Sequence, residues 1–156
     1  MGTVVSSPIG VLRARIARGE LSHEALIDQV LQAAVGPAAQ HVFTRHYEAA
    51  ARAAARHADA AQQAGIALPP LAGLPVTVKD LYDIAGETTM AGSVVCEGEA
   101  PATVDAVAVQ RLRSQGAAIV GKTNMTEFAF SGVGINPHHG TPRNPADAAL
   151  ARIPGG

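Results

Sequence analysis

The 156-residue sequence is poor in aromatic residues and in cysteine. Phe, Tyr and Trp together make up 3% of the chain, Trp is absent, and Cys96 is the single cysteine. One cysteine excludes an internal disulfide framework, and its neighbours supply no Cys or His at the spacing of a metal site. These absences predict a protein of a reducing, cytoplasmic compartment that holds no metal.

The chain also lacks a charge excess of either sign and a long apolar run. Its 12 Lys and Arg residues stand against 13 Asp and Glu residues, which leaves a formal charge of -1. Electrostatics therefore gives no reason to expect nucleic acid or an anionic membrane surface as a partner. No stretch approaches the roughly 20 apolar residues that a membrane-spanning helix needs, and the N-terminus lacks the pattern of a secretory signal.

Helix signals dominate the first 65 residues, and the 47% apolar content of the chain is enough for one buried core. The pair Ser7-Pro8 opens a first helix, Ser22 caps a second, and an alanine-rich third helix is expected from about residue 45 to residue 64. Gly65 then stops the pattern. We therefore expect residues 1–70 to form an N-terminal helical segment.

The character of the sequence changes after the two prolines at positions 69 and 70. Residues 74–78 read as a strand, residues 104–115 as a helix capped by Thr103, and residues 117–120 as a second strand. Two strands joined by a crossover helix normally lie parallel, so residues 71–156 are expected to form an α/β core. Asn124 and Glu127 have capping-box spacing, which predicts a short helix there.

Lys79, at the end of the first predicted strand, is the first candidate for chemistry. A lysine in this place is most often solvated, because lysines are seldom buried without a partner. A desolvated lysine would instead have a lowered pKa, so that its neutral amine could accept a proton from a hydroxyl nucleophile. Ser-Lys pairs of this kind are a known variant of the Ser-His-Asp arrangement. The strand by itself leaves both interpretations open.

The other polar groups give weaker signals. His138 and His139 are adjacent, so they point to opposite sides of an extended chain, and we interpret them as turn residues. The Gly-Lys-Thr triplet at 121–123 lacks the rest of a phosphate-binding loop, so its glycine is expected in a tight turn with Lys122 facing solvent. Asp80 has the character of ordinary surface charge. We predict no metal and no cofactor.

Four separated blocks carry a more specific signal: LAGLPVTVKDLYDIAGETTMAGS, DAVAVQRLRSQGAAIVGKTNMTEFAF, GINPHHGTPRNP and RIPGG. Taken in this order, they resemble the first part of the amidase signature family, over residues 71–156. The resemblance implies an α/β fold of the amidase-signature type, with a mixed sheet flanked by helices. It also implies hydrolysis or transfer of amide groups by a Ser-cisSer-Lys triad, without metal or cofactor.

The same resemblance assigns site residues. It implies that Lys79 is the triad lysine, which would deprotonate the bridging cis-serine and so activate the nucleophilic serine. The stretch expected to border the scissile amide and hold its NH2 group is Phe128, Ala129, Phe130 and Ser131. The family's Gly-Gly-Ser-Ser motif would begin at Gly155-Gly156, so both serines are absent from this chain. On this hypothesis the chain alone is an inactive amino-terminal part of an amidase.

Two other functions stay open. The chain could be a non-catalytic binding module, because a half-built sheet leaves an edge strand and apolar helix faces for a partner. It could also belong to the amidase subunit of a tRNA-dependent amidotransferase. The partner expected of the complete amidase is a small-molecule amide, whose identity the sequence does not give. A homodimer is one of the assemblies left open.

Overall fold

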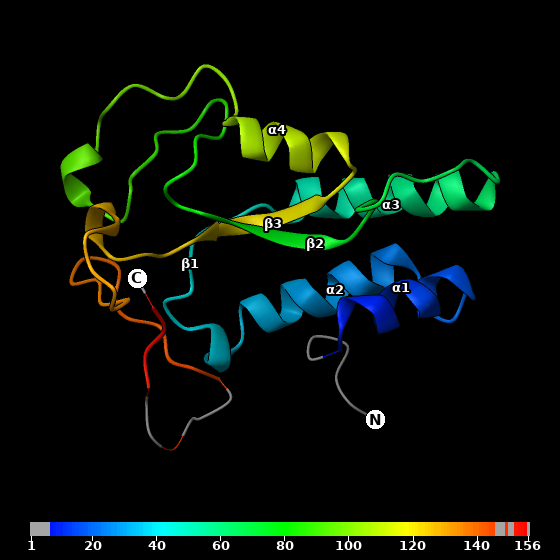
Figure 1. The fold of residues 1–156 in the computed structure, drawn as a ribbon, viewed down its shortest axis with the longest axis horizontal. Helices are drawn as coiled ribbons and strands as arrows, with labels where there is room; N and C mark the ends of the chain where they lie inside the picture. Colours follow the sequence, from blue (N-terminus) through cyan, green and yellow to red (C-terminus); the bar gives the residue numbers. More distant parts are fainter. Residues whose placement is uncertain (1–6, 146–148, 150–151, 156) are drawn as a thin grey trace. The chain divides into compact units, whose positions relative to one another are not determined.

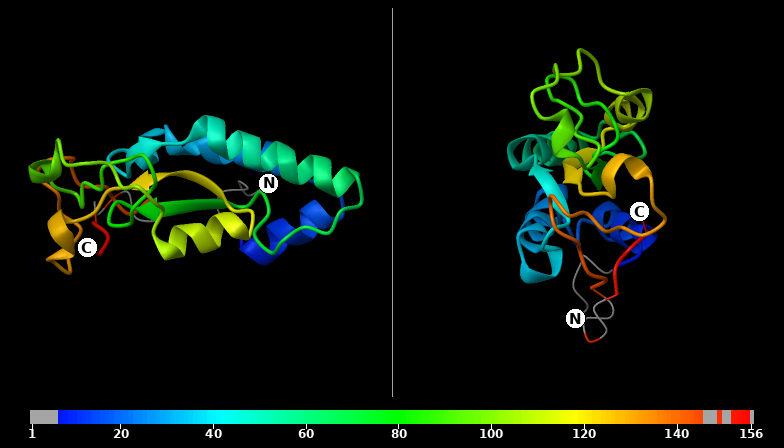
Figure 2. Two further views of the ribbon diagram at one scale, coloured as in Figure 1. Left: turned by 90° about the horizontal axis from the view of Figure 1, so that it is seen from above. Right: turned by 90° about the vertical axis from the view of Figure 1, so that its left-hand side faces the viewer.

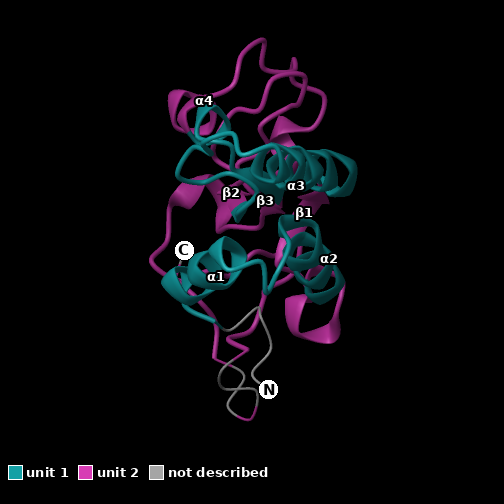
Figure 3. Cartoon of the chain, turned by 90° about the vertical axis from the view of Figure 1, so that its right-hand side faces the viewer, with its two compact units in different colours: residues 1–33, 47–76, 112–120 teal, residues 34–46, 77–111, 121–156 magenta. Residues whose placement is uncertain are grey.

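The computed structural model describes residues 7–145, 149 and 152–155. The chain divides into two compact units, which Figure 3 shows in different colours. Unit 1 comprises residues 1–33, 47–76 and 112–120, and unit 2 comprises residues 34–46, 77–111 and 121–156. Each unit is therefore assembled from segments that lie far apart in the sequence. The predicted segments 1–70 and 71–156, which concern the domains of the complete protein, stay a prediction.

Unit 1 contains α1 (Ile9–Ala17), nearly all of α2 (His23–Ala34) and α3 (Glu48–Gln63) (Figure 1). The Ser22 hydroxyl accepts a hydrogen bond from the Ala25 N–H at 3.0 Å, which confirms the predicted cap of α2. Every fourth or third residue of α3 is a buried alanine, so this helix offers a narrow face for close packing. The aliphatic core of the unit consists of Leu12, Ile16, Leu21, Leu26 and Leu74.

Helices α2 and α3 are antiparallel neighbours within unit 1 (Figure 2). His23 at the start of α2 bonds to Asp59 near the end of α3, whereas Asp28 further along α2 pairs with Arg52 near the start of α3. The residue numbers thus rise along one helix as they fall along the other. The Asp28–Arg52 pair is partly exposed, whereas the His23 side chain of the other pair is buried.

The sheet has three strands in the order β1-β3-β2, namely β1 (Phe43–His46), β2 (Pro75–Lys79) and β3 (Ala118–Thr123). Strand β1 is antiparallel to β3. The Ala118 N–H donates to the Leu74 carbonyl at 2.9 Å and the Asp80 N–H donates to the Thr123 carbonyl at 3.0 Å, so β2 and β3 run parallel. With α4 (Val107–Ser114) between them, they confirm the predicted strand–helix–strand unit and the mixed α/β class.

Strand β1 lies inside the region predicted to be helical, so that prediction is wrong for residues 43–46. The third helix begins at Glu48 rather than near residue 45. Local helix propensity is overridden here because the partner of β1 is β3, more than 70 residues further along the chain. Thr103 is likewise not the cap of α4, since that helix begins at Val107. The Ala106 N–H is instead bonded to the Asp83 carbonyl at 2.9 Å.

The predicted capping box is also wrong. The Asn124 side chain accepts from the N–H of the next residue, Met125, at 2.8 Å, and it donates to the carbonyls of His41 and Gly140. Asn124 therefore ties three segments of unit 2 together instead of starting a helix. Only a single 3-10 turn, η4 (Glu127–Ala129), follows it. Among the described residues, no helix has the length and apolarity to cross a bilayer.

Candidate active site

Lys79 is the last residue of β2, where the run Pro75–Lys79 follows the extended conformation that its β-branched residues favour. Its side chain is half-buried. Lys79 is therefore positioned at the end of a strand. Its amine has no hydrogen-bonding or ion-pair partner among the described residues.

The residue after Lys79 belongs to a buried ion pair. Asp80 is 1% exposed and Lys122 is 2% exposed, and the Lys122 Nζ lies 3.2 Å from the Asp80 Oδ1. The Asp80 Oδ2 has no hydrogen-bonding partner among the described residues, and the ammonium meets Oδ1 without hydrogen-bond geometry. The predictions that Lys122 faces solvent and that Asp80 is surface charge are wrong. Strand β3 is the central strand and is buried on both faces, so even its lysine is enclosed.

Gly121, next to this lysine, has a role other than the tight turn that was predicted. It lies inside β3, opposite β1. A Cβ atom at this position would lie 2.4 Å from the Arg45 carbonyl oxygen and 2.8 Å from a ring carbon of Phe43. Only glycine allows β1 to approach β3 so closely, and the pairing is irregular between Phe43 and Arg45.

Two backbone hydrogen bonds connect the Lys79 end of β2 to the predicted substrate-binding stretch. The Ala91 N–H donates to the Asp80 carbonyl at 2.9 Å, and the Phe128 N–H donates to the Ala91 carbonyl at 2.9 Å. The structure thus links Asp80, the residue after Lys79, to Phe128 through two hydrogen bonds of Ala91. Sequence reasoning missed Ala91, whose only signal was its place in the block GETTMAGS.

The backbone around this connection is strained. Ala91, Phe128 and Ala129 have φ values of 50°, 51° and 55°, in the left-handed region that residues with a Cβ avoid. Strain of this kind gathers at binding and catalytic sites, where the surrounding structure maintains it. Phe128 is 53% exposed and Phe130 is 95% exposed, so the turn presents apolar rings at the surface. The Ser131 hydroxyl oxygen accepts from the Val133 N–H at 3.1 Å.

Ser93 and Glu127 form a hydrogen bond directly before the strained turn. The hydroxyl of Ser93, a fully buried residue, donates to the Glu127 Oε1 at 2.5 Å, and the His138 Nε2 lies 3.2 Å from the same oxygen. The Ser93 hydrogen bond lowers the pKa of Glu127, desolvation opposes this effect, and His138 adds to it. The carboxylate is thereby held in one place, directly before Phe128 in the chain.

Asn136 is a second support that sequence reasoning missed. It is 2% exposed, and its amide nitrogen donates to the carbonyls of Gly92 and Met125 at 2.7 Å each. Its amide oxygen accepts from the N–H groups of His138 and His139, which are turn residues as predicted. One side chain therefore joins the segment around residue 92, the segment around residue 125 and the loop beyond residue 132.

The described residues contain no group of three or more His, Cys, Asp or Glu side chains that could hold a metal ion. The donors of this site are instead amines, hydroxyls, amides and backbone groups. Such groups suit hydrogen bonding to a neutral polar substrate and proton transfer. The prediction that the chemistry needs no metal stays a prediction.

The Amidase family model matches residues 25–156. The chain belongs to the amidase signature family. This confirms the resemblance drawn from the four sequence blocks, and the family model extends further toward the N-terminus than those blocks do. Lys79, the Ala91 turn and the Phe128 stretch all lie within the matched region.

Curated amidase signature relatives cover several activities. The chain is 47% identical over 116 residues to the AtzE subunit of 1-carboxybiuret hydrolase from Pseudomonas sp. (strain ADP), which is 74% of this chain and 25% of that protein. It is 43% identical to 2-amino-5-chloromuconic acid deaminase of Comamonas testosteroni, over 92% of this chain and 31% of that protein. It is 44% identical to the A subunit of glutamyl-tRNA(Gln) amidotransferase from Acidothermus cellulolyticus, over 93% of this chain and 28% of that protein.

Solved structures show the same fold. A protein from an inhibitor-bound "vestigial protein complex" related to an s-triazine catabolic enzyme matches with a TM-score of 0.84 and 42% identity, over 92% of this chain and 31% of that chain. A peptide amidase in complex with chymostatin matches with a TM-score of 0.71 and 32% identity, over 86% of this chain and 29% of that chain. The chain thus spans between a quarter and a third of the length of the relatives it matches.

Proposed function

We propose that this chain is the lysine-bearing part of an amidase that hydrolyses the C–N bond of a small carboxamide. A single observation carries the proposal: Lys79 ends β2 with an unengaged amine, and Ala91 links the next residue to Phe128. The lysine and the exposed turn at residues 128–131 then flank one reaction site. The family membership supports amide chemistry over other uses of a free lysine.

In the proposed mechanism, Lys79 acts as the base of a Ser-cisSer-Lys triad, and both serines lie outside this chain. The neutral amine takes a proton from the bridging serine, which takes one from the nucleophilic serine as that oxygen attacks the amide carbonyl. The protons return along the same relay to the departing ammonia or amine. Water then hydrolyses the acyl-enzyme. Without the serines, the 156-residue chain is expected to be inactive by itself.

The carboxylate that follows Lys79 in the chain is already paired with another lysine. The Asp80 Oδ1 lies 3.2 Å from the Lys122 Nζ, whereas the Lys79 amine has no partner among the described residues. This pairing supports a role of Lys79 other than an ion pair with Asp80.

The backbone carbonyls of residues 128–131 and the Ser131 hydroxyl are the groups proposed to hold the NH2 of the substrate. The turn is exposed, and Phe128 and Ala129 have left-handed backbone conformations. On this proposal, carbonyl oxygens of the turn would accept hydrogen bonds from the amide NH2 while Lys79 acts as the base. The exposed rings of Phe128 and Phe130 would then contact an apolar part of the amide.

The test is ammonia release from a panel of primary amides by the complete protein encoded by the gene that contains this chain. Lys79→Ala is expected to lower kcat by at least about a thousandfold, because triad members act as a unit. Arg18→Ala, at an exposed position of unit 1, is the matched control and should leave kcat unchanged. Unaltered turnover in Lys79→Ala would refute the role of Lys79.

A second candidate is the amidase subunit of a tRNA-dependent amidotransferase, favoured by the 44% identity to such a protein. The amide would then be glutamine, and the ammonia would pass to a partner protein. Glutamine hydrolysis that depends on co-expressed partner proteins would favour this candidate, whereas hydrolysis of simple amides by the protein alone would favour the first. Self-association as a homodimer stays a prediction, which the molecular mass in solution would test.

A binding module is the remaining alternative, and exposed apolar side chains favour it. Phe130 is 95% exposed and Val95 is 75% exposed, both in unit 2. A monomer with a cooperative thermal transition, measured on the isolated chain, would favour an autonomous module. Aggregation or a broad transition would favour a part of a larger enzyme.

A further inference from the structure

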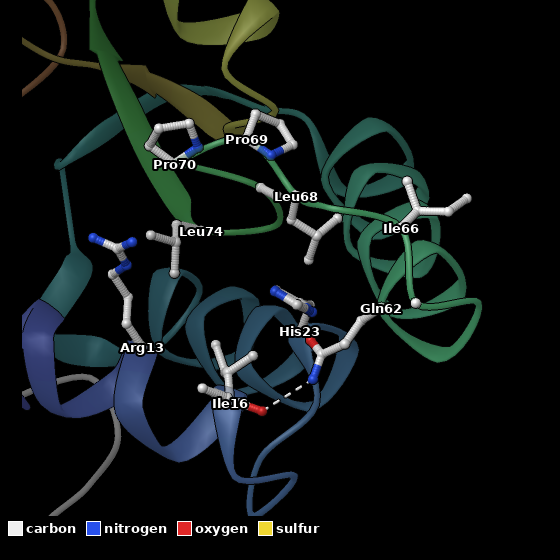
Figure 4. A pocket seen from close by; sticks show the side chains of 12 residues that line it. Arg13, Ile16, His23, Gln62, Ile66, Leu68, Pro69, Pro70 and Leu74 are labelled. Carbon is white, nitrogen blue, oxygen red and sulfur yellow. Dashed lines mark hydrogen bonds between the residues drawn. The ribbon is translucent and has the colours of Figure 1, made fainter.

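Asp59 and Glu127 each have a histidine ring nitrogen close to a carboxylate oxygen, at 2.8 Å and 3.2 Å respectively. Asp59 lies in unit 1 and contacts His23, one of the residues around the pocket that Figure 4 shows. It also accepts from the N–H groups of His23 and Glu24 at the start of α2, so helix capping explains its position. Glu127 lies in unit 2, and its side chain accepts from no backbone N–H group of the described residues. Its position therefore has a different explanation.

The Glu127 carboxylate is fixed by a side chain from an earlier segment of the chain. The hydroxyl of Ser93, which is fully buried, donates to the Glu127 Oε1 at 2.5 Å. The same hydroxyl oxygen accepts from the Val95 N–H at 3.2 Å, so the donor is itself oriented. The His138 Nε2 contacts the same Oε1 from the loop beyond residue 132. Both side-chain contacts of Glu127 thus converge on one oxygen atom.

The two segments that carry this hydrogen bond are also joined through their backbones. The Phe128 N–H donates to the Ala91 carbonyl at 2.9 Å. A Cβ atom at Gly92 would lie 2.7 Å from the Met125 carbonyl oxygen, so the two backbones are in close contact there. The side-chain bond of Glu127 lies between these two backbone contacts. The chain is therefore fixed up to the start of the turn at residue 128.

The turn itself has few contacts beyond this point. Phe128 and Ala129 have the left-handed conformation, and the Phe130 N–H donates to the Glu127 carbonyl at 3.2 Å within the same turn. The carbonyl oxygens of residues 128–131 accept no hydrogen bond from the described residues. They are free to accept from a ligand, and their direction depends on how the start of the turn is held.

We propose that Glu127 is a positioning residue for amide recognition, because the hydrogen bond from Ser93 to its Oε1 holds the turn at residues 128–131 in the orientation that receives the substrate NH2. This inference rests on the proposed amidase function. A strained turn keeps its conformation only where the surrounding structure maintains it. Without the bond, the carbonyl oxygens lose their alignment with the NH2 group. An ester has no N–H to donate, so its hydrolysis does not depend on this alignment.

The test compares the complete protein and its variants on two substrates: the primary amide that the wild-type protein hydrolyses fastest, and the methyl ester of the same acid. Glu127→Ala is expected to lower kcat/KM for the amide about tenfold and to change that for the ester less than about twofold. Glu127→Gln keeps an oxygen that can accept from Ser93, so it should retain most of the amide activity. Glu97→Ala, at an exposed glutamate of the same unit, is the matched control and should change neither value.

Equal losses for the amide and the ester in Glu127→Ala show a merely structural role and overturn the inference. So does an unchanged value for the amide, or an equal loss in Glu127→Gln. Ser93→Ala removes the donor and keeps the carboxylate, so it must give the same amide-specific loss, even if Glu127→Ala does not fold. A wild-type protein that hydrolyses no amide refutes the proposed function and this inference with it. Wild-type amide turnover with unchanged selectivity in the variants refutes this inference alone.

Discussion

The two units stabilise their interiors in different ways. Unit 1 buries mainly aliphatic side chains and alanines, and among its described residues His23 is the one buried polar residue. Unit 2 buries fewer aliphatic side chains but encloses more polar ones, namely Asp80, Ser93, Lys122, Thr126 and Asn136. Apolar packing tolerates exchange of one hydrocarbon side chain for another, whereas a buried polar group depends on a specific partner.

This difference matches the proposed role of unit 2. The polar contacts of unit 2 fix the ends of β2 and β3 and the strained turns at Ala91 and Phe128, where the reaction site is proposed. Strain there has to be maintained by directional bonds, because non-directional apolar packing would let the turns relax. The comparison between the units leads to four stability predictions, each measured by urea unfolding of the complete protein encoded by the gene that contains this chain.

The largest loss is expected for Lys122→Met in unit 2. The substitution leaves the buried Asp80 carboxylate without its ammonium, which typically costs about 3–5 kcal/mol in the free energy of unfolding. The double variant Asp80→Asn with Lys122→Met should recover much of this loss, because no uncompensated charge remains. If the double variant were as unstable as the single one, packing rather than charge would explain the effect.

A somewhat smaller loss is expected for Leu26→Ala in unit 1. Leu26 is fully buried in the aliphatic cluster, and truncating a core leucine costs about 3 kcal/mol. Leu26→Met keeps the volume and should cost less than about 1.5 kcal/mol. Unit 1 is thus expected to tolerate exchange of one buried hydrocarbon side chain for another, whereas the buried polar groups of unit 2 are not expected to tolerate loss of a partner. Equal destabilisation by both substitutions would contradict the comparison.

Ser93→Ala is expected to destabilise the chain less than Leu26→Ala and to change its acid dependence. Glu127 has a folded-state pKa below its ordinary value of 4.5, so its stabilising contribution is present above pH 4.5 and is lost as pH falls through the lower folded value. Ser93 is the main cause of that lowering, so the variant should lose less stability on acidification. An unchanged acid dependence would argue against this link.

The smallest effect is expected for Arg18→Ala. Arg18 pairs with Glu20 at the surface of unit 1, with both side chains about half exposed. Exposed pairs contribute little, because water screens the charges and both side chains lose freedom. The unfolding midpoint should not change measurably. A clear loss would show that surface charge, rather than the aliphatic cluster, contributes to the stability of unit 1.

Several elements could be predicted because their signals are local. Ser22 caps α2 through a bond within one helical turn, and Gly65 ends the helical pattern with φ of 69°. The alternation in residues 74–78 and the crossover helix were enough to indicate a parallel pair of strands. The four sequence blocks indicated the family, and they made Lys79 a candidate for the site.

Only the tertiary structure decided which residues far apart in the chain pair or contact each other. Residues 43–46 became a strand because β3 pairs with them, and Lys122 became buried because β3 lies at the centre of the sheet. The connection between the Lys79 end of β2 and the Phe128 turn runs through Ala91, which has no local signal of its own. Residue type and spacing determined which chemistry this chain could take part in. Burial and long-range hydrogen bonds decided which groups meet, because both depend on the whole chain having folded.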